Sequence, residues 1–300
     1  MNLTESILNY RRYLKRKNYS PHTVKNYLHR LQRFFSWLSV PLEVASTENV
    51  KFYIDFLLEQ QLSAQTINGH IVVIRMFYDY LKDEEEVRID NPVLKGMMLR
   101  VAKPLPRHLR DTDVPVFFDA VTRRRDLAIF MLMLRCGLRV EEVADLTLGA
   151  IDYQRNRILV KSGKGGKDRV VFISNDASDA LATYLRIRFH TNEQNVFLVE
   201  KGIHKGKPIS VRGIQKRIEY YSKKSGISVS CHQLRHTMAT QLLNADADLV
   251  TIQYLLGHTR IKTTMRYCHL SNMKAQRDYY EAVTRVIEKS KGTIAWNMRY

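Results

Sequence analysis

The chain has 300 residues, enough for two domains, and 45% of them are hydrophobic, which is enough for a sizeable core. Its 48 Lys and Arg residues outnumber its 30 Asp and Glu residues, and the net charge of +18 favours a polyanionic partner, first of all nucleic acid. The N-terminus lacks a secretory signal pattern, no apolar run approaches the roughly 18 residues of a membrane span, and the cysteines are too scattered for a disulfide framework. We therefore expect a cytoplasmic protein without a membrane partner.

The basic residues are concentrated near the N-terminus. Residues 1–40 contain eight Lys and Arg against one acidic residue, a charge of +7, whereas residues 41–100 contain six against ten, a charge of −4. A concentrated basic face is typical of a surface that follows a phosphate backbone.

The first 95 residues have the pattern of a helical domain. Ser20 and Pro21 form an N-cap followed by a proline at the first helical position, and a second helix starts near Ser63. The spacing of three and four that marks a buried helical face is carried by Val24, Tyr27, Leu28, Leu31, Phe34, Phe35 and Leu38, and then by Thr66, Ile67, His70, Ile71, Ile74, Phe77, Tyr78 and Leu81. Asn91 and Pro92 end the helical run.

The remaining chain indicates a linker and a second domain. Residues 96–109 hold two prolines and several cations, and we interpret them as a linker to a domain of residues 110–300. Two β-rich runs within 157–174 flank the turn GKGG, which predicts a β-hairpin. Residues 125–147 have a helical pattern up to Gly137 and a second one after it. Helical patterns return after the hairpin, at 176–189, 211–224, 232–243, 248–256 and about 273–289. The expected fold class is therefore mainly α with a small antiparallel β-sheet.

The stretch CHQLRHTMAT raises the question of a metal or an anion site. His232 and His236 are four residues apart, as in a zinc-binding helix, but the glutamate of HExxH is missing and Arg235 would repel a dication. A phosphate suits these side chains better, because a guanidinium donates two parallel hydrogen bonds and an imidazole adds another. Capping or surface contacts are the remaining interpretation.

Four other segments carry side chains of the same kind. Arg139 follows a glycine bend, with Glu142 three residues later, and Lys164 lies within GKGGK. His258 follows Gly257 at a helix end, and Tyr267 comes nine residues after His258. Each of these residues alone is compatible with an ordinary structural role.

In this order and spacing, the segments resemble the tyrosine recombinase family, the lambda-integrase and Xer-type site-specific recombinases. SPHTVKNYLHRLQRFFSWL and SAQTINGHIVVIRMFYDYL look like the helices of the family's SAM-like core-binding domain, and GLRVEEV, GKGGKDR, HQLRHTMAT, LLGH and TTMRY look like its catalytic signatures. The resemblance covers nearly the whole chain. It implies a catalytic set of Arg139, Lys164, His232, Arg235, His258 and Tyr267, supported by Glu142 and His236.

The resemblance implies attack of Tyr267 on a DNA phosphodiester, which gives a 3′-phosphotyrosine and a free 5′-hydroxyl. The two arginines would stabilise the charge that develops on the phosphate, with His258 as a further donor. His232 would take the tyrosine proton, and Lys164 would protonate the leaving oxygen. No metal or cofactor is expected, because neither a carboxylate cluster for two magnesium ions nor GxxxxGK[ST] is present in the sequence.

The expected partner is double-stranded DNA with inverted half-sites, bound by a dimer at each site and a tetramer on two sites. The tail of about residues 271–300 would dock on a neighbouring protomer or on its own domain, and an accessory directionality factor is an optional partner. Integration, excision, transposition and resolution of DNA elements share this chemistry. The alternatives are DNA relaxation in the manner of type IB topoisomerases and a non-catalytic DNA-binding protein of the same fold.

Overall fold

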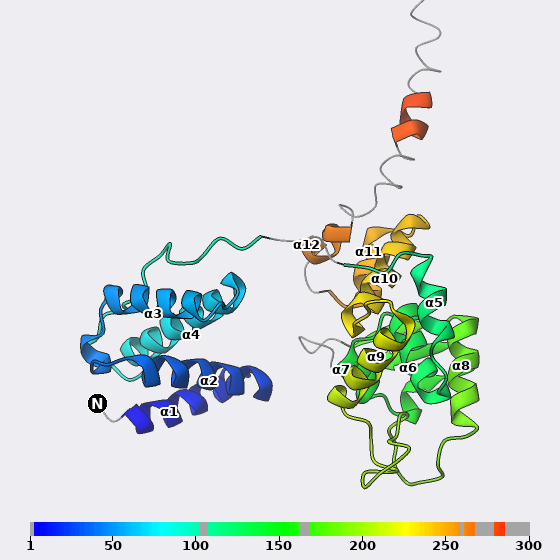
Figure 1. Ribbon diagram of the computed structural model, residues 1–300, viewed down its shortest axis with the longest axis horizontal. Helices are drawn as coiled ribbons and strands as arrows, with labels where there is room; N and C mark the ends of the chain where they lie inside the picture. Colours follow the sequence, from blue (N-terminus) through cyan, green and yellow to red (C-terminus); the bar gives the residue numbers. More distant parts are fainter. Residues whose placement is uncertain (1–2, 103–106, 162–167, 259–260, 268–278, 286–300) are drawn as a thin grey trace, which may run out of the picture. The chain divides into compact units, whose positions relative to one another are not determined.

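The computed structural model describes residues 3–102, 107–161, 168–258, 261–267 and 279–285. It divides into two compact units, Met1–Lys103 and Pro104–Tyr300 (Figure 1). The division falls within the segment 96–109 that the sequence indicates as a linker.

The first unit consists of helices and one short 3-10 turn. Its elements are α1 (Leu3–Arg16), α2 (Pro21–Trp37), η1 (Leu42–Val44), α3 (Thr47–Glu59) and α4 (Ala64–Asp83). The side chains of Ser20 and Ser63 accept hydrogen bonds from the backbone N–H groups of Thr23 and Thr66, which places the starts of α2 and α4 as expected.

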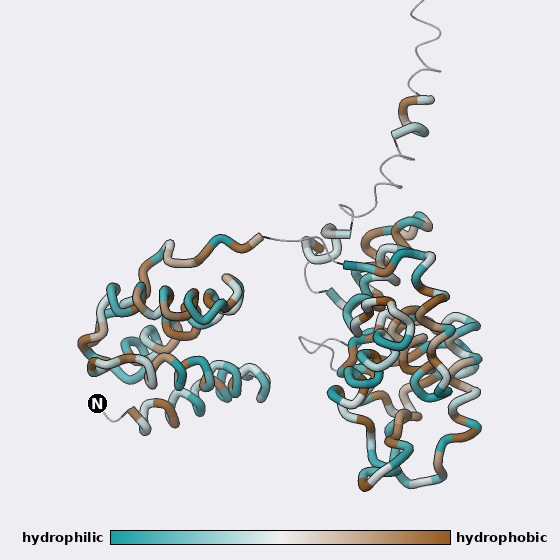
Figure 2. The backbone as a smooth tube through the Cα atoms, in the orientation of Figure 1, coloured by the Kyte–Doolittle hydropathy of each residue, from teal (hydrophilic) through white to brown (hydrophobic). Residues whose placement is uncertain are grey.

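Aromatic side chains fill the core of this unit. Tyr10, Phe34, Tyr53 and Phe77 have 0% exposure, and the rings of Phe34 and Tyr53 meet edge to face at 5.0 Å. Hydrophobic and hydrophilic residues alternate along the helices (Figure 2), so that each helix has one face for the core and one for solvent. His70 is the buried polar residue of α4, and its Nδ1 lies 3.0 Å from the Tyr53 hydroxyl.

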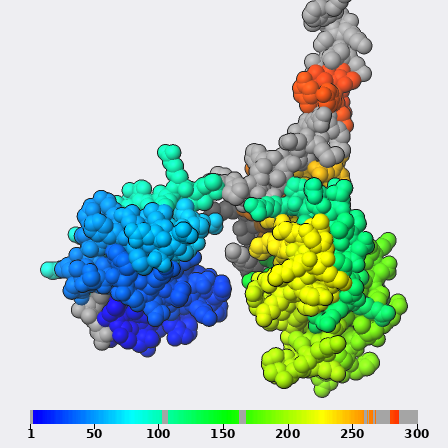
Figure 3. All heavy atoms as spheres, viewed as in Figure 1, coloured from blue at the N-terminus to red at the C-terminus, as the bar shows by residue number. Residues whose placement is uncertain are grey.

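The second unit combines helices with a small sheet. Its helices are α5 (Asp113–Asp119), α6 (Arg124–Arg135), α7 (Val140–Ala144), α8 (Asn175–Leu185), α9 (Val211–Ser225), α10 (Cys231–Asn244), α11 (Leu249–Leu256) and α12 (Ile261–Thr264). Two 3-10 turns, η2 (Leu148–Ala150) and η3 (Met265–Tyr267), complete the helical elements. α9 lies at the surface of this unit (Figure 3).

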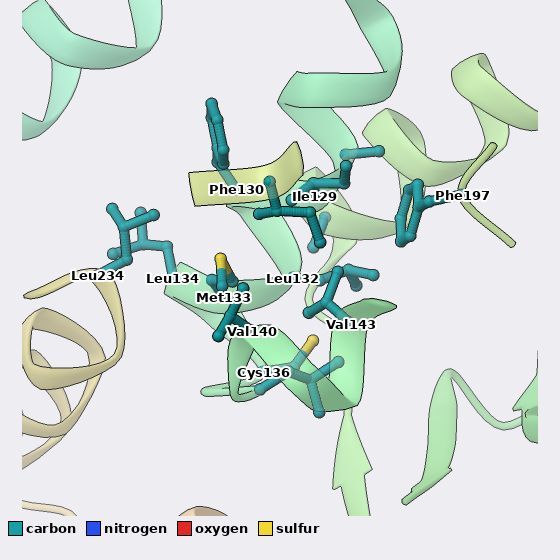
Figure 4. Packing of buried hydrophobic residues seen from close by; sticks show 14 of the residues in the cluster. Ile129, Phe130, Leu132, Met133, Leu134, Cys136, Val140, Val143, Phe197 and Leu234 are labelled. Carbon is teal, nitrogen blue, oxygen red and sulfur yellow. The ribbon is translucent and has the colours of Figure 1, made fainter. Parts of the chain in front are cut away.

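Helix α6 is the centre of the second unit. Ile129, Phe130, Leu132 and Met133 on α6 all have 0% exposure and pack within one cluster that includes Leu234 of α10 (Figure 4). A helix that is apolar on nearly all sides is typical of a core position. Both α7 and α10 pack against α6 through this cluster.

The strands β1 (Ile151–Asp152), β2 (Arg157–Val160) and β3 (Arg169–Phe172) form an antiparallel sheet in the order β1-β2-β3. The pairing Leu159↔Val170 belongs to the hairpin that the sequence predicts, whereas the two-residue β1 is an addition to that prediction. The expected fold class is confirmed. Lys164, at the hairpin tip, lies outside the described residues.

Two further expectations concern the C-terminal part and membranes. Of the segment expected to be helical at about 273–289, residues 279–285 are described, and they are helical. No helix in the described part of the chain is long and apolar enough to cross a membrane.

Candidate active site

The bend after α6 brings two arginines together. Gly137 adopts φ 64°, a conformation in which a side chain is strained, and Arg139 follows it at the start of α7. Arg235 comes from α10, is 5% exposed, and donates hydrogen bonds to the carbonyls of Gly137 and Leu256. The backbone turn therefore serves as the acceptor that holds the second arginine.

Glu142 is the carboxylate of the cluster, one helical turn beyond Arg139. It accepts hydrogen bonds of 2.7 Å from both the backbone N–H and Nη1 of Arg139. Arg169 donates to both of its oxygens, at 2.7 and 2.8 Å. Burial favours the neutral acid, but the hydrogen bonds and charges of the two arginines outweigh it and lower the pKa of Glu142 to about 2.

The turn after α11 contributes backbone carbonyls and a histidine. Gly257 ends α11 in the left-handed conformation with φ 57°. Arg139 Nη2 donates to the carbonyls of Leu256 and Gly257 at 3.1 Å. His258 Nδ1 lies 2.9 Å from the hydroxyl of Thr264, which is itself fully buried. Burial, with the charges of Arg235 and Arg139, lowers the pKa of His258 to about 4, so this imidazole is neutral at pH 7.

Tyr267 lies in the last described 3-10 turn, at 1% exposure. Its hydroxyl is 2.7 Å from Nδ1 of His236, and its ring is parallel to that of His258, with an interplanar angle of 6° and a centroid distance of 6.4 Å. The same ring packs with Met238 and Leu256 in a small apolar cluster. Contacts with two histidines and with apolar side chains thus hold the tyrosine in place.

His232 differs from the expectation. It is exposed in the first turn of α10 and lines a surface groove with Arg212 and Ser230. Residues four apart on a helix share a face but are separated by about 6 Å along its axis, so His232 and His236 occupy different levels. The contact with the Tyr267 hydroxyl, expected of His232, is made by His236.

The structure gathers most of the expected site residues in one place. Hydrogen bonds and ring contacts connect six of them, which are Arg139, Glu142, Arg235, His236, His258 and Tyr267. The described residues include no group of three or more His, Cys, Asp or Glu side chains arranged to hold a metal ion.

Sequence reasoning did not single out Arg169 and Thr264. Arg169 occupies an inward position of β3, and an arginine in the inward phase of an alternating strand signals a buried partner. Thr264 is one of the two threonines before Met265, and a hydroxyl fully buried beside a histidine is the feature that identifies it.

The cluster has an excess of positive charge. Arg139, Arg169 and Arg235 contribute three guanidinium charges against the one carboxylate of Glu142, which leaves a formal charge of +2. Burial and the neighbouring Arg139 lower the pKa of Arg235 to about 9, and it remains protonated at pH 7. A buried excess of this kind suits an anion that brings its own negative charge.

Comparison with protein families identifies both parts of the chain. The phage integrase family matches residues 107–274, more than half of the sequence, and the N-terminal SAM-like domain of phage integrases matches residues 7–85. The chain belongs to the phage integrase family. The resemblance to tyrosine recombinases is thereby confirmed, and the protein is an enzyme of the site-specific DNA recombinase class.

Relatives in this family cover nearly the whole chain. The tyrosine recombinase XerA of Thermococcus kodakarensis is 30% identical over 292 residues, covering 96% of this chain and 98% of its own length. The tyrosine recombinase XerC of Staphylococcus haemolyticus is 31% identical, with 92% and 95% coverage. The structure of the Tn1549 transposon integrase superposes with a TM-score of 0.73 at 20% identity, covering 91% of this chain and 98% of that one, which supports the fold.

Proposed function

We propose that this phage integrase family member cleaves and rejoins double-stranded DNA at a specific site through a 3′-phosphotyrosine on Tyr267. The observation that carries the proposal is the Tyr267 hydroxyl, held 2.7 Å from His236 at a cluster of buried arginines. Attack on a phosphodiester needs a nucleophile, a proton acceptor and stabilisation of the phosphorane charge. These side chains supply all three.

The arginines bind the phosphate. Arg139 and Arg235 each direct hydrogen bonds to backbone carbonyls, which fixes the planes of both guanidinium groups before the substrate arrives. Their other N–H groups bind the nonbridging oxygens, where negative charge increases in the transition state. Neutral His258 adds a donor in the tautomer that carries its proton on Nε2, in which Nδ1 accepts the hydrogen bond from the Thr264 hydroxyl 2.9 Å away.

Three further residues have roles in this proposal, two of them in proton transfer. His236 accepts the Tyr267 proton as the Oη–P bond forms, and His232 contacts the phosphate from the exposed start of α10. Lys164 protonates the 5′-oxygen as its bond to phosphorus breaks. In rejoining, a 5′-hydroxyl attacks the phosphotyrosine and the protons return. Since the phosphotyrosine linkage conserves the energy of the broken phosphodiester bond, no nucleotide cofactor is consumed.

The first unit provides a second DNA-binding surface in this proposal. A groove between α1 and α2 is lined by Arg11, Lys15, Tyr19, Lys25 and His29 among other residues. Cations interleaved with an aromatic ring suit a phosphate backbone. We assign residues 1–95 as the core-binding domain, 96–109 as the linker and 110–300 as the catalytic domain. The Tn1549 integrase, of similar fold, was solved in complex with circular intermediate DNA.

The proposed assembly is a dimer on each DNA site and a tetramer on two sites. Strand exchange between two duplexes requires four tyrosines, one for each broken strand. The segment 271–300 is proposed to dock on a neighbouring protomer, and an accessory factor to set the direction of the reaction. In the cell, the protein acts in the cytoplasm, on nucleoid DNA.

Capture of covalent DNA from cells tests this proposal. Cells that express the chain are lysed in SDS and EDTA, the protein is purified, and the attached DNA is sequenced, with Tyr267→Phe as the control. One discrete sequence on the wild type and none on the control supports site-specific recombination. Scattered sequences indicate topoisomerase-like relaxation. Absence of an adduct both in cells and on a nicked substrate indicates a non-catalytic DNA-binding protein.

A further inference from the structure

Arg169 joins three parts of the site. It is the first residue of β3, and its side chain is 4% exposed. Its two terminal nitrogens donate to both oxygens of Glu142, at 2.7 and 2.8 Å, and its Nε donates to the carbonyl of Leu255 at 2.9 Å. One side chain therefore connects the β-hairpin, the carboxylate that holds Arg139, and the end of α11.

The turn that carries His258 lies directly against this arginine. A Cβ atom added to Gly257 would be 3.0 Å from Arg169 Cδ and 3.2 Å from its Nε. A side chain at this position would require Arg169 to shift, and the φ of 57° also favours glycine. The position of Arg169 thus determines how closely the turn before His258 packs on the strand.

Arg169 offsets the negative charge of Glu142. The carboxylate is needed to orient Arg139, which it contacts through the backbone N–H and Nη1. With Arg139 as its single cationic partner, the carboxylate would cancel the charge that a phosphate requires. Arg169 occupies both carboxylate oxygens with a forked, bidentate contact. The three arginines and Glu142 then keep a formal charge of +2, where two arginines and Glu142 would have +1.

We infer that Arg169 is a positioning residue of the reaction, which neutralises Glu142 so that Arg139 keeps its charge for the scissile phosphate. This inference rests on the proposed function of the site. Arg169 does not touch the DNA. It acts through Glu142 and through the Leu255 carbonyl, and its charge, not only its contacts, is what the reaction uses.

An ion pair with a purely structural role is the alternative. Such a pair would also lower stability when broken, because Glu142 would be left buried with fewer donors. The two accounts differ in what restores cleavage. In the charge account, Glu142→Gln together with the removal of Arg169 returns the cluster to +2, since Arg139 and Arg235 remain without an opposing charge. The amide oxygen at position 142 keeps an acceptor that orients Arg139.

The experiment measures single-turnover cleavage of a nicked suicide substrate by the wild type, Arg169→Met, Arg169→Lys and the double variant Arg169→Met with Glu142→Gln. Thermal unfolding and DNA binding of each protein are measured in parallel, and cleavage is assayed well below the lowest unfolding temperature. We expect Arg169→Met to cleave about 100-fold more slowly while it still binds the DNA. The double variant should recover about tenfold or more of this loss.

Three results would overturn the inference. The first is that Arg169→Met cleaves at the wild-type rate, and the second is that the folded double variant is no faster than Arg169→Met. If Arg169→Met does not fold, Arg169→Lys decides, because lysine keeps the charge and should retain at least about a tenth of the wild-type rate. A larger loss would contradict the charge account. If the wild type itself forms no adduct, the proposed function fails instead, which separates the two claims.

Discussion

The hydroxyl of Tyr267 lies 2.7 Å from Nδ1 of His236, one helical turn beyond the histidine that the sequence motif suggests as its partner. The two histidines are on the same helix, α10, with ring centroids 6.4 Å apart. His236 is half-buried against the tyrosine, whereas His232 is exposed. Of these two histidines, His236 therefore contacts the tyrosine and is the proposed proton acceptor, whereas His232 lies at the surface.

Substitution of the two histidines should have unequal effects on the attack step. His236→Ala removes the proton acceptor and is expected to slow covalent attachment of DNA about 10²-fold or more. His232→Ala, the matched control on the same helix, should slow it less, because it leaves the Tyr267 contact in place. Single-turnover rates at saturating protein provide the measurement. A greater loss in His232→Ala would show that the tyrosine changes its partner when DNA binds.

Gly137 is expected to be intolerant of a side chain. At φ 64°, alanine is strained, and its Cβ would lie 2.9 Å from Met238 Sδ. The left-handed conformation alone costs a residue with a side chain roughly 1–2 kcal/mol, so Gly137→Ala should lower the free energy of unfolding by at least about that amount. Because the Gly137 carbonyl holds Arg235, cleavage should fall too.

Gly149→Ala is the control for this substitution, since Gly149 has no atom within 4 Å of an added Cβ. Its free energy of unfolding in urea should stay within about 0.5 kcal/mol of the wild type. Equal stability of the two alanine variants would refute the account of the bend.

Asp126 should be among the most sensitive buried positions outside the site. It is 0% exposed and accepts hydrogen bonds from Arg125 at 2.7 and 3.0 Å and from Arg217 at 2.7 Å. Asp126→Asn removes the carboxylate shared by Arg125 and Arg217, and Arg125 keeps the longer ion pair of 3.9 Å with Glu200. We expect a loss of about 3–5 kcal/mol in the free energy of unfolding. For comparison, Glu48→Gln breaks an exposed pair and should cost less than about 1 kcal/mol. Urea denaturation of both variants tests the contrast.

Acid should destabilise the chain before its carboxylates titrate. The pKa values of His70 and His258 are lowered from 6.5 to about 4, first by burial and then by nearby arginines, Arg30 and Arg33 in the case of His70. The folded chain keeps both rings neutral, whereas the unfolded chain binds protons below about pH 6.5. The contribution of these two histidines to stability is therefore fully present above that pH and falls as the pH decreases from 6.5 toward 4.

Unfolding temperatures at a series of pH values measure this effect. His70→Asn removes one of the two groups, so the unfolding temperature of this variant should depend less steeply on pH in that window. An unchanged slope in the variant, or an unfolding temperature that is constant from pH 7 to pH 5 in the wild type, would argue against the burial of a neutral His70.

Local signals in the sequence predict much of this fold. Ser20 caps α2 as expected, and α4 starts beside Ser63 as expected, because such start signals depend only on the residues that follow them. The hairpin is found where β-rich runs flank glycines. The two-residue strand β1 was not predicted, since Ile151 and Asp152 are strand residues only through their pairing with Ile158 and Arg157.

The sequence motifs indicate which residues of the candidate site lie together, but not which of them make contact. Arg139, Arg235, His258 and Tyr267 converge as the motifs suggest. The choice between His232 and His236 depends on where η3 docks against α10, which is a tertiary contact that helical spacing does not encode. Arg169 is buried for the same kind of reason, as its partners are far away in sequence.

Covalent attachment at Tyr267 is the most direct test of the central claim. A nicked duplex with the target sequence recovered from cells is incubated with wild-type protein. The short fragment that carries the released 5′-hydroxyl then dissociates, which traps the adduct. Mass spectrometry of the digested adduct should find the 3′-phosphate of the DNA on Tyr267, and Tyr267→Phe, folded and able to bind the duplex, should form none. An adduct on another residue, or an adduct formed by Tyr267→Phe, would contradict the assignment of Tyr267 as the nucleophile.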